Sequence, residues 1–145
     1  MKDDAAEIGR RFQVDEPIEV TVEKIAEFCA AMGDNNPLYL DPVAAKAGPY
    51  GGIIAPPAYA ASFRRAEIAS ATLFPRGGLM AGIDIEMKLP IRPGDFISIS
   101  TEVKETYEKT GRSGTMDFTV IRSTLTNQTR EVVAYIDYRM MNRRR

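Results

Sequence analysis

Length, composition and charge limit what this chain can be. It has 145 residues, the size of one ordinary domain, and its 19 basic and 20 acidic side chains leave a formal net charge of −1. That balance provides no strong field for nucleic acid or for a membrane surface, so neither is an expected partner. Because the sequence has one cysteine, Cys29, and no histidine, it excludes an internal disulfide and the usual type of zinc site.

Length and composition together predict a single domain over residues 1–145. No segment approaches the length of a membrane span, and the first residues lack the apolar core of a signal peptide. The single cysteine fits a reducing compartment. We therefore expect a soluble protein of the cytoplasm.

The first third of the chain predicts one short strand and two helical segments. The strand is expected around residues 18–20, after which Thr21 is placed to cap a helix that Gly33 ends. Asp41 and Gly48 bound a shorter helical turn with proline at its first position. The first helix should bury one apolar stripe, formed by Val22, Ile25, Ala26, Cys29 and Met32. Cys29 is then a core residue rather than a nucleophile.

The rest of the chain predicts a slim helix followed by an antiparallel sheet. Glycines and prolines precede a helix over residues 56–71, whose many alanines leave Tyr59, Phe63 and Ile68 as its larger contacts. From Leu79 onward the apolar period changes to two. Strands are expected over residues 83–89, 97–103, 115–125 and 131–140, with a tight turn at 92–95 and a polar turn at 126–129. The simplest architecture is an α+β fold whose antiparallel sheet wraps round the alanine-rich helix.

The segment GDNNPLYLD, residues 33–41, resembles a motif of a known family. It is similar to the MaoC-like family of (R)-specific enoyl-CoA hydratases and 3-hydroxyacyl-thioester dehydratases, whose fold is the hot-dog fold. The matching residues are Gly33, Asp34, Asn36, Pro37, Leu38 and Asp41. The stretch GGIIAPPAYAASF resembles the family's transition into the central helix, and the likeness extends over nearly the whole chain, including the RPGD turn.

This resemblance implies both a reaction and a set of site residues. The family adds water across the double bond of a trans-2-enoyl thioester, or removes it from a 3-hydroxyacyl thioester, without a metal or an organic cofactor. The thioester is carried by coenzyme A or by acyl carrier protein. The family's catalytic aspartate and histidine correspond to Asp34 and Tyr39 of this chain. The implied substrate-binding positions are Asn36, Gly52, Ala55, Pro57 and Tyr59.

The chain departs from the family pattern at two places. Tyr39 replaces the histidine, and a phenol with an ordinary pKa of about 10 is a poor base at neutral pH, although it can donate a proton. Hydratases of the family have Ala-His-Gly at the start of the central helix, where the glycine N–H helps to form the oxyanion hole. This chain has Ala55-Pro56-Pro57 there, and proline has no N–H.

Three functions remain open on these residues. The pattern resembles the N-terminal or non-catalytic half of hydratases built from two hot-dogs. In these hydratases that half shapes the acyl pocket beside a half that carries the catalytic histidine. The resemblance therefore implies a second hot-dog, which is either a histidine-bearing subunit or a second copy of this chain. The alternatives are a self-sufficient hydro-lyase using Asp34 and Tyr39, and a hot-dog thioesterase with Asp34 or Glu67 as base. Asp34 and Asn36 could also form nothing more than local turns, with Tyr39 as a core or interface aromatic. The sequence does not identify the acyl group.

Overall fold

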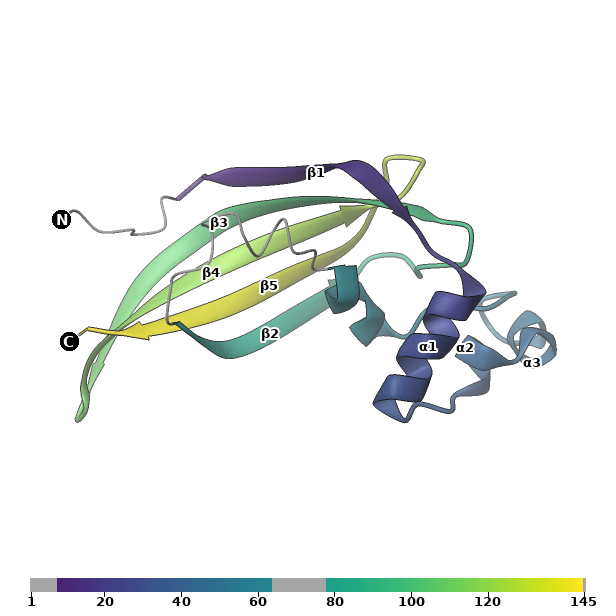
Figure 1. Cartoon of the computed structure of the whole chain (residues 1–145), viewed down its shortest axis with the longest axis horizontal. Coiled ribbons are helices and arrows are strands. Elements are labelled where there is room, and N and C mark those ends of the chain that lie inside the picture. Colours follow the sequence, from purple (N-terminus) through teal and green to yellow (C-terminus); the bar gives the residue numbers. More distant parts are fainter. Residues whose placement is uncertain (1–7, 64–77, 145) are drawn as a thin grey trace.

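The computed structural model of the chain describes residues 8–63 and 78–144, in which five strands form one antiparallel sheet. The strands are β1 Arg11–Glu19, β2 Leu79–Met87, β3 Phe96–Gly111, β4 Gly114–Thr126 and β5 Val132–Arg143. Their order across the sheet is β1-β3-β4-β5-β2. In Figure 1 the long strands β3, β4 and β5 form the curved middle of the sheet, with β1 and β2 at its edges.

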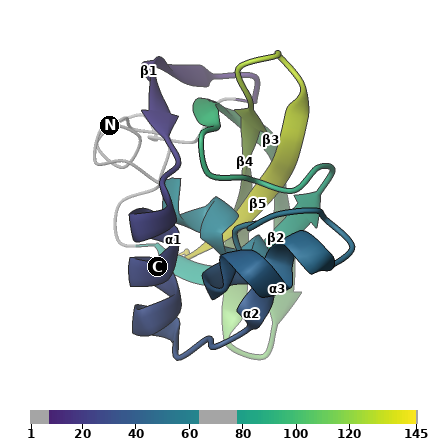
Figure 2. The same cartoon turned by 90° about the vertical axis from the view of Figure 1, so that its right-hand side faces the viewer.

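Three short helices gather at one end of this sheet, as Figures 1 and 2 show. They are α1 Val22–Met32, α2 Pro37–Leu40 and α3 Pro42–Ala47. The predicted caps of α1 are confirmed, because Thr21 Oγ1 accepts the Lys24 N–H at 3.2 Å and Gly33 adopts the left-handed conformation at φ 69°. Asp41 caps α3 by accepting the Val43 N–H at 3.0 Å. These local signals therefore fix where the helices begin and end.

The apolar stripe predicted for α1 is wrong at both of its ends. Ile25 and Cys29 are buried, but Val22 is 44% exposed and Met32 63% exposed. Only the middle of α1 packs against the core, where Phe28 joins the buried cluster. The first and last turns of α1 lie beyond the part of the helix that packs on the sheet and η1, so their side chains are exposed.

The central helix begins as a tighter helix than expected. Residues Pro57–Phe63 form the 3₁₀ helix η1, which contacts β2 and β5. Its first turn closes through the Tyr59 N–H and the Pro56 carbonyl at 2.9 Å, and neither Pro56 before it nor Pro57 at its first position supplies an N–H donor. The remainder of the predicted helix, with Ile68, lies outside the described residues, as does Glu67.

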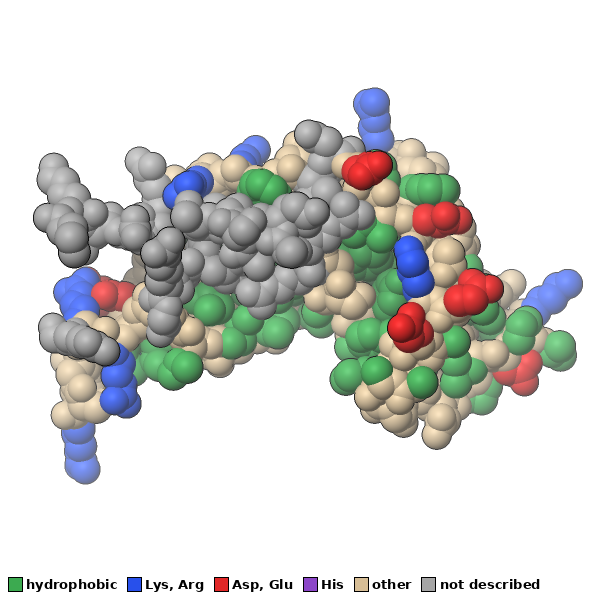
Figure 3. Space-filling view, in the orientation of Figure 1, with side chains coloured by type: hydrophobic (Ala, Val, Ile, Leu, Met, Phe, Trp, Pro, Cys, Tyr) green, Lys and Arg blue, Asp and Glu red, His purple; other side chains and the backbone are tan. Residues whose placement is uncertain are grey.

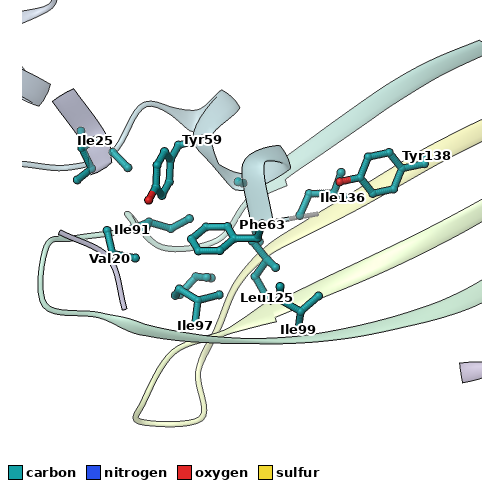
Figure 4. Close-up of a cluster of buried hydrophobic side chains, with 14 of the residues drawn as sticks. Val20, Ile25, Tyr59, Phe63, Ile91, Ile97, Ile99, Leu125, Ile136 and Tyr138 are labelled. Carbon is teal, nitrogen blue, oxygen red and sulfur yellow. The ribbon is translucent and has the colours of Figure 1, made fainter. Parts of the chain in front are cut away.

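The core lies on the inward face of the sheet, beneath η1 and α1 (Figure 4). Alternate residues of the middle strands are buried there, as the period of two predicted: Ile97, Ile99, Thr101, Val103, Ile121, Leu125, Ala134, Ile136, Tyr138 and Met140. Three polar side chains, those of Thr101, Thr119 and Ser123, are buried in the same face. The Thr101 and Ser123 hydroxyls lie 2.9 Å apart and hydrogen-bond to each other, so this pair costs little to bury.

The outward face carries a charged cluster that the sequence pattern did not identify. Arg122 donates to Asp137 through Nε at 2.7 Å and Nη2 at 3.0 Å, and Lys104 Nζ donates to the same carboxylate at 3.3 Å. Burial of Asp137 opposes its ionisation, but the hydrogen bonds and charges of Arg122 and Lys104 together outweigh it and lower the pKa of this carboxyl. Arg122 also lies over the Tyr135 ring, 4.9 Å from its centroid.

Asp137→Asn should lower stability at neutral pH and lose its effect in acid. Because the folded-state pKa of Asp137 is depressed, its ionisation stabilises the fold above the unfolded pKa, and this contribution is lost as pH falls through the folded pKa. We expect a loss of about 1–3 kcal/mol at pH 7, as for hydrogen bonds to charged groups. Thermal unfolding measured from neutral to acidic pH checks it.

The matched control for this experiment is Asp84→Asn. Asp84 also pairs with an arginine, Arg139, at 3.4 Å, but its side chain is 67% exposed, so its loss should change stability little. If the difference in stability between the wild type and Asp137→Asn stayed constant down to strongly acidic pH, it would contradict the role given to Asp137.

Candidate functional site

The candidate site is the loop that joins α1 to α3. Gly33 turns the chain away from α1, and the Asp34 N–H then donates to the Cys29 carbonyl at 2.9 Å. Asn36 caps α2 by accepting the Leu38 N–H at 3.0 Å. The loop is thus a defined succession of turns between two helix caps, which holds its side chains in fixed positions.

Asp34 lies half-buried at the start of this loop. Its Oδ1 accepts the Asn36 N–H at 3.1 Å, in the manner of an Asx turn. Among the described residues, no donor lies within hydrogen-bonding distance of Oδ2. One oxygen of the carboxylate therefore holds the loop, while the other can accept from a water or from a ligand.

Tyr39 follows Asp34 at the margin of the core. Its N–H donates to the Asn36 carbonyl at 3.0 Å, and its half-buried ring packs against the core cluster. Burial raises the pKa of the Tyr39 phenol, and the negative charge of Asp34 raises it further, with smaller effects from Cys29 and Tyr50. The phenol is accordingly protonated at neutral pH and can serve as a hydrogen-bond donor or an acid, not as a base.

Cys29 lies beneath the loop, as a core residue with 1% of its surface exposed. Burial raises the pKa of its thiol, and the charge of Asp34 acts in the same direction. A thiol that is buried and protonated is a poor nucleophile.

The segment from Gly52 to Ala55 runs beside the loop. The Ile54 N–H donates to the Leu38 carbonyl at 3.3 Å, and the Ala55 N–H donates to the Ile91 carbonyl at 2.7 Å. A methyl group placed on Gly52 would lie 3.9 Å from Arg92 Nη1, so this glycine faces the arginine of the turn before β3. The Ile54 bond holds this segment against α2, next to Tyr39 in the chain, whereas the Ala55 bond ties it to the segment before β3.

Backbone donors are scarce where the central helix begins. The Ala55 N–H is already paired with Ile91, and Pro56 and Pro57 have none. An oxyanion hole needs N–H groups aimed at the thioester oxygen. None of these three positions can supply one.

Tyr59 and Pro57 have different surroundings from the loop residues. Pro57 is exposed at the start of η1, and Tyr59 is buried with its ring edge-to-face against Phe28 and Phe63. Tyr59 borders a cavity of about 350 Å³ between α1 and η1, the lining of which contains no other predicted site residue. The cavity residues Phe28 and Ala31 were missed because they lie off the apolar stripe counted on α1.

Among the helices that the structure describes, none is long and apolar enough to span a membrane. Within residues 8–63 and 78–144, no three His, Cys, Asp or Glu side chains are placed to hold a metal ion together.

The fold and the motif define the class of protein. An antiparallel sheet in this strand order, with the Gly-Asp loop following α1, is the hot-dog fold of MaoC-like dehydratases and hydratases. The chain belongs to the family described as "FAS1-like, dehydratase domain region", whose model matches residues 6–136. A UPF0336 protein of Streptomyces avermitilis is 34% identical over 107 residues, which cover 70% of this chain and 71% of that protein.

Solved structures of dehydratases have the same fold. A MaoC-like dehydratase from Rhodospirillum rubrum is 26% identical, with a TM-score of 0.75 over 96% of this chain and 94% of that one. A chain of the HadBC (3R-hydroxyacyl-ACP dehydratase) complex from Mycobacterium tuberculosis is 20% identical, with a TM-score of 0.77 over 93% and 96% of the two chains. At the latter identity the likeness shows the fold alone.

Replacing Asp34 should make the Tyr39 phenol easier to ionise. Burial and the Asp34 charge both raise the pKa of Tyr39, so Asp34→Asn removes one of the two main causes and should shift its titration to lower pH. The measurement is the tyrosinate absorbance over alkaline pH, with Tyr39→Phe spectra subtracted to isolate this ring. Glu23→Gln, at the exposed first turn of α1, is the control and should leave the titration in place. An unchanged titration in Asp34→Asn would show that the two groups do not interact.

Proposed function

We propose that this chain is a hot-dog subunit of an enoyl-thioester hydratase or 3-hydroxyacyl-thioester dehydratase, and that it shapes the acyl pocket beside a histidine-bearing subunit. The observation that carries the proposal is Tyr39, a protonated phenol in the position where the family has its histidine base. The thioester of coenzyme A or acyl carrier protein is the proposed substrate. A reducing cytoplasm is the proposed location, and the free, buried thiol of Cys29 supports it.

The chemistry of hydration explains why this loop by itself is incomplete. Water must lose a proton as its oxygen bonds to C3, a proton must reach C2, and the negative charge that develops on the thioester oxygen needs donors. Asp34 has one free carboxylate oxygen that can orient water, and Tyr39 can supply a proton. Neither a base of neutral imidazole type nor an N–H at Ala55, Pro56 or Pro57 is offered to the substrate.

The retained parts of the loop support a role in shaping the substrate site. Asp34, Asn36 and Tyr39 are held by the turns of the loop, and the segment Gly52–Ala55 is joined to it by the bond from the Ile54 N–H to the Leu38 carbonyl. The resemblance assigns these positions, together with Pro57 and Tyr59, to substrate binding. In this proposal they face a cleft shared with the second subunit.

A second function is favoured by the protonation state of Tyr39. Since its raised pKa keeps the phenol protonated, Tyr39 could act as the acid of a self-sufficient hydro-lyase in which Asp34 orients the water. A thioesterase using Asp34 or Glu67 would instead release a free thiol. Hydration and thioester hydrolysis therefore give different products, and the assay below distinguishes them.

The isolated chain should hydrate an enoyl thioester far more slowly than its mixture with a histidine-bearing hot-dog subunit. General-base catalysis contributes about 100- to 10,000-fold, so a deficit of at least about 100-fold is expected for the chain alone. The measurement is loss of enoyl-thioester absorbance, with free thiol assayed in parallel. In the mixture, Asp34→Asn should retain the rate within about tenfold, because the base belongs to the partner.

Two results would reject this assignment. Rapid hydration by the pure chain, abolished by Asp34→Asn and by Tyr39→Phe, would establish an Asp-Tyr enzyme. Release of free thiol would establish a thioesterase. Glu23→Gln, outside the site, controls for differences between preparations.

The edge of the sheet at β2 is the proposed contact with the second hot-dog. An edge strand with exposed apolar side chains invites pairing, and β2 exposes Leu79, Met80 and Ile83. Figure 3 shows hydrophobic side chains gathered along the side of the molecule where β2 lies. The HadBC complex, whose fold this chain shares, joins two such subunits, which supports a hot-dog partner.

Ile83→Lys should weaken this assembly. Ile83 is 45% exposed at the β2 edge, and burying a lysine there would cost at least about tenfold in the dissociation constant. Light scattering of the chain, alone and mixed with the partner, should show the wild type assembled and the variant closer to the 16.1 kDa monomer. Val43→Lys, at an 80% exposed position on α3, is the control and should not dissociate it. A wild type that stays monomeric in both settings argues against the pairing.

A further inference from the structure

Arg92 is a half-buried arginine whose guanidinium has no partner in the fold. It begins the turn before β3, where its own backbone N–H donates to Asp95 Oδ2 at 2.9 Å. In the part of the chain that the structure describes, no acceptor lies within hydrogen-bonding distance of its side chain. A guanidinium carries a full charge and five donors. The side chain of Arg92 therefore has unused donors that a ligand can occupy.

The carboxylate that follows Arg92 in the same turn is engaged elsewhere. Asp95 Oδ2 accepts the Arg92 N–H, and Oδ1 accepts from Gln128 Nε2 at 3.0 Å. Gln128 Oε1 in turn accepts the Phe96 N–H at 3.1 Å, which ties this turn to the one between β4 and β5. The Asp95 carboxylate is thus directed to a backbone N–H and a side-chain amide, so the turn gives the guanidinium no counterion.

Gly52 lies opposite this guanidinium and leaves space beside it. A methyl group placed on Gly52 would lie 3.9 Å from Arg92 Nη1, and apart from its neighbours in the chain it would meet no other described atom within 4 Å. The space is therefore bounded by a cation on one side and by bare backbone on the other. The two segments lie side by side where the helices gather (Figures 1 and 2), and the Ala55 N–H joins them through the Ile91 carbonyl.

The backbone on the Gly52 side offers two free N–H groups. The Gly51 N–H before them and the Ile54 N–H after them each donate to a backbone carbonyl at 3.3 Å. Between these, the N–H groups of Gly52 and Ile53 have no acceptor among the described residues. Backbone N–H groups of folded proteins are nearly always paired with the protein or with water. Two successive unpaired groups therefore mark a place where an acceptor from outside the chain can bind.

This set of donors favours a phosphate group over a carboxylate. A guanidinium fork by itself matches the two oxygens of a carboxylate, so the added N–H groups suit an anion with more acceptors. A phosphate group has that larger number of oxygens, and successive backbone N–H groups are a known type of anion-binding site. Glycine at position 52 fits this use, because a side chain there would occupy the space beside the guanidinium.

We propose that Arg92 and the N–H groups of Gly52 and Ile53 bind a phosphate group. The site is joined to the α2 end of the candidate loop, since the Ile54 N–H donates to the Leu38 carbonyl. Both carriers named in the proposed function hold their thioester on a phosphopantetheine arm, so this arm is one source of the phosphate, and inorganic phosphate is the other. The carrier as the source rests on the proposed function, whereas the phosphate site rests on the geometry alone.

The test compares ligands that differ only in the phosphate group, on the full chain alone and mixed with the hot-dog partner. Butanoyl-phosphopantetheine carries the phosphate, and butanoyl-pantetheine has the same thioester and arm without it. Both are saturated, so neither can be hydrated while calorimetry measures binding. We expect the wild type to bind the phosphorylated ligand at least about tenfold more tightly, which is the effect of one hydrogen bond to a charged group. Inorganic phosphate is the third ligand and should compete with it.

Arg92→Ala should remove the preference for phosphate. It should weaken butanoyl-phosphopantetheine and inorganic phosphate at least about tenfold and leave butanoyl-pantetheine unchanged, because the guanidinium contacts the phosphate alone. Arg92→Lys keeps the charge without the planar fork and should give an intermediate loss. The matched control is Arg112→Ala, which removes the same charge from an exposed position between β3 and β4. It should bind all three ligands as the wild type does.

Gly52→Leu leaves the charge in place and fills the space instead. The first added carbon would meet Arg92 Nη1 at 3.9 Å, which is an ordinary contact, so the backbone has no need to move. This variant should weaken the two phosphate ligands as Arg92→Ala does. Because the two variants act through different atoms, agreement between them excludes a general loss of positive charge as the cause.

Two results overturn the inference. One is a wild type that binds the two thioesters equally and does not bind inorganic phosphate; the other is an equal loss in Arg92→Ala and Arg112→Ala. Inorganic phosphate that binds through Arg92 without displacing butanoyl-phosphopantetheine would identify free phosphate as the ligand of the site. Failure of the proposed function gives a different result. If hydration never appears with a histidine-bearing partner while the phosphate preference depends on Arg92, the phosphate site stands and the hydratase assignment falls.

Discussion

The buried inward face of the sheet is the constraint on which the rest of the structure depends. The inward residues of β3, β4 and β5 are mostly apolar side chains that cannot face water, and the buried hydroxyls of Thr101 and Ser123 hydrogen-bond to each other. In the described part of the chain, α1 and η1 are the elements that cover this face. Their positions constrain the loop between them, because the Asp34 N–H at its start donates to the carbonyl of the buried Cys29.

The turn geometry of the loop and its proton chemistry depend on different side chains. Its turns depend on backbone and amide hydrogen bonds, through Gly33, Asp34 and Asn36, and these are present. Proton transfer depends on the side chain at position 39, where burial and the Asp34 charge keep the phenol protonated. A substitution of the side chain at position 39 can therefore change the proton chemistry and leave the turns in place.

Local signals in the sequence predicted the boundaries of α1 and α3 and the alternation of the strands, but not the short helix α2. A cap such as Thr21 or Asp41 bonds to an N–H two or three residues away, so it can be recognised without the rest of the fold. The exposure of Met32 and the burial of Phe28 could not be predicted in this way, since they depend on where α1 meets the sheet. The ion pair of Arg122 with Asp137 joins neighbouring strands, and it needed the β4–β5 register, which the sequence alone does not specify.

Because sequence patterns are local, they identified the Gly33–Asp41 motif and did not identify the cavity between α1 and η1. Asp34, Asn36 and Tyr39 lie within one short stretch, so a family pattern identifies them together. Phe28, Tyr59 and Phe63 come from two elements separated by the loop, and their rings meet only after α1 and η1 have packed on the sheet. The packing of these two elements therefore sets both the fixed position of the polar loop and the apolar space beside it.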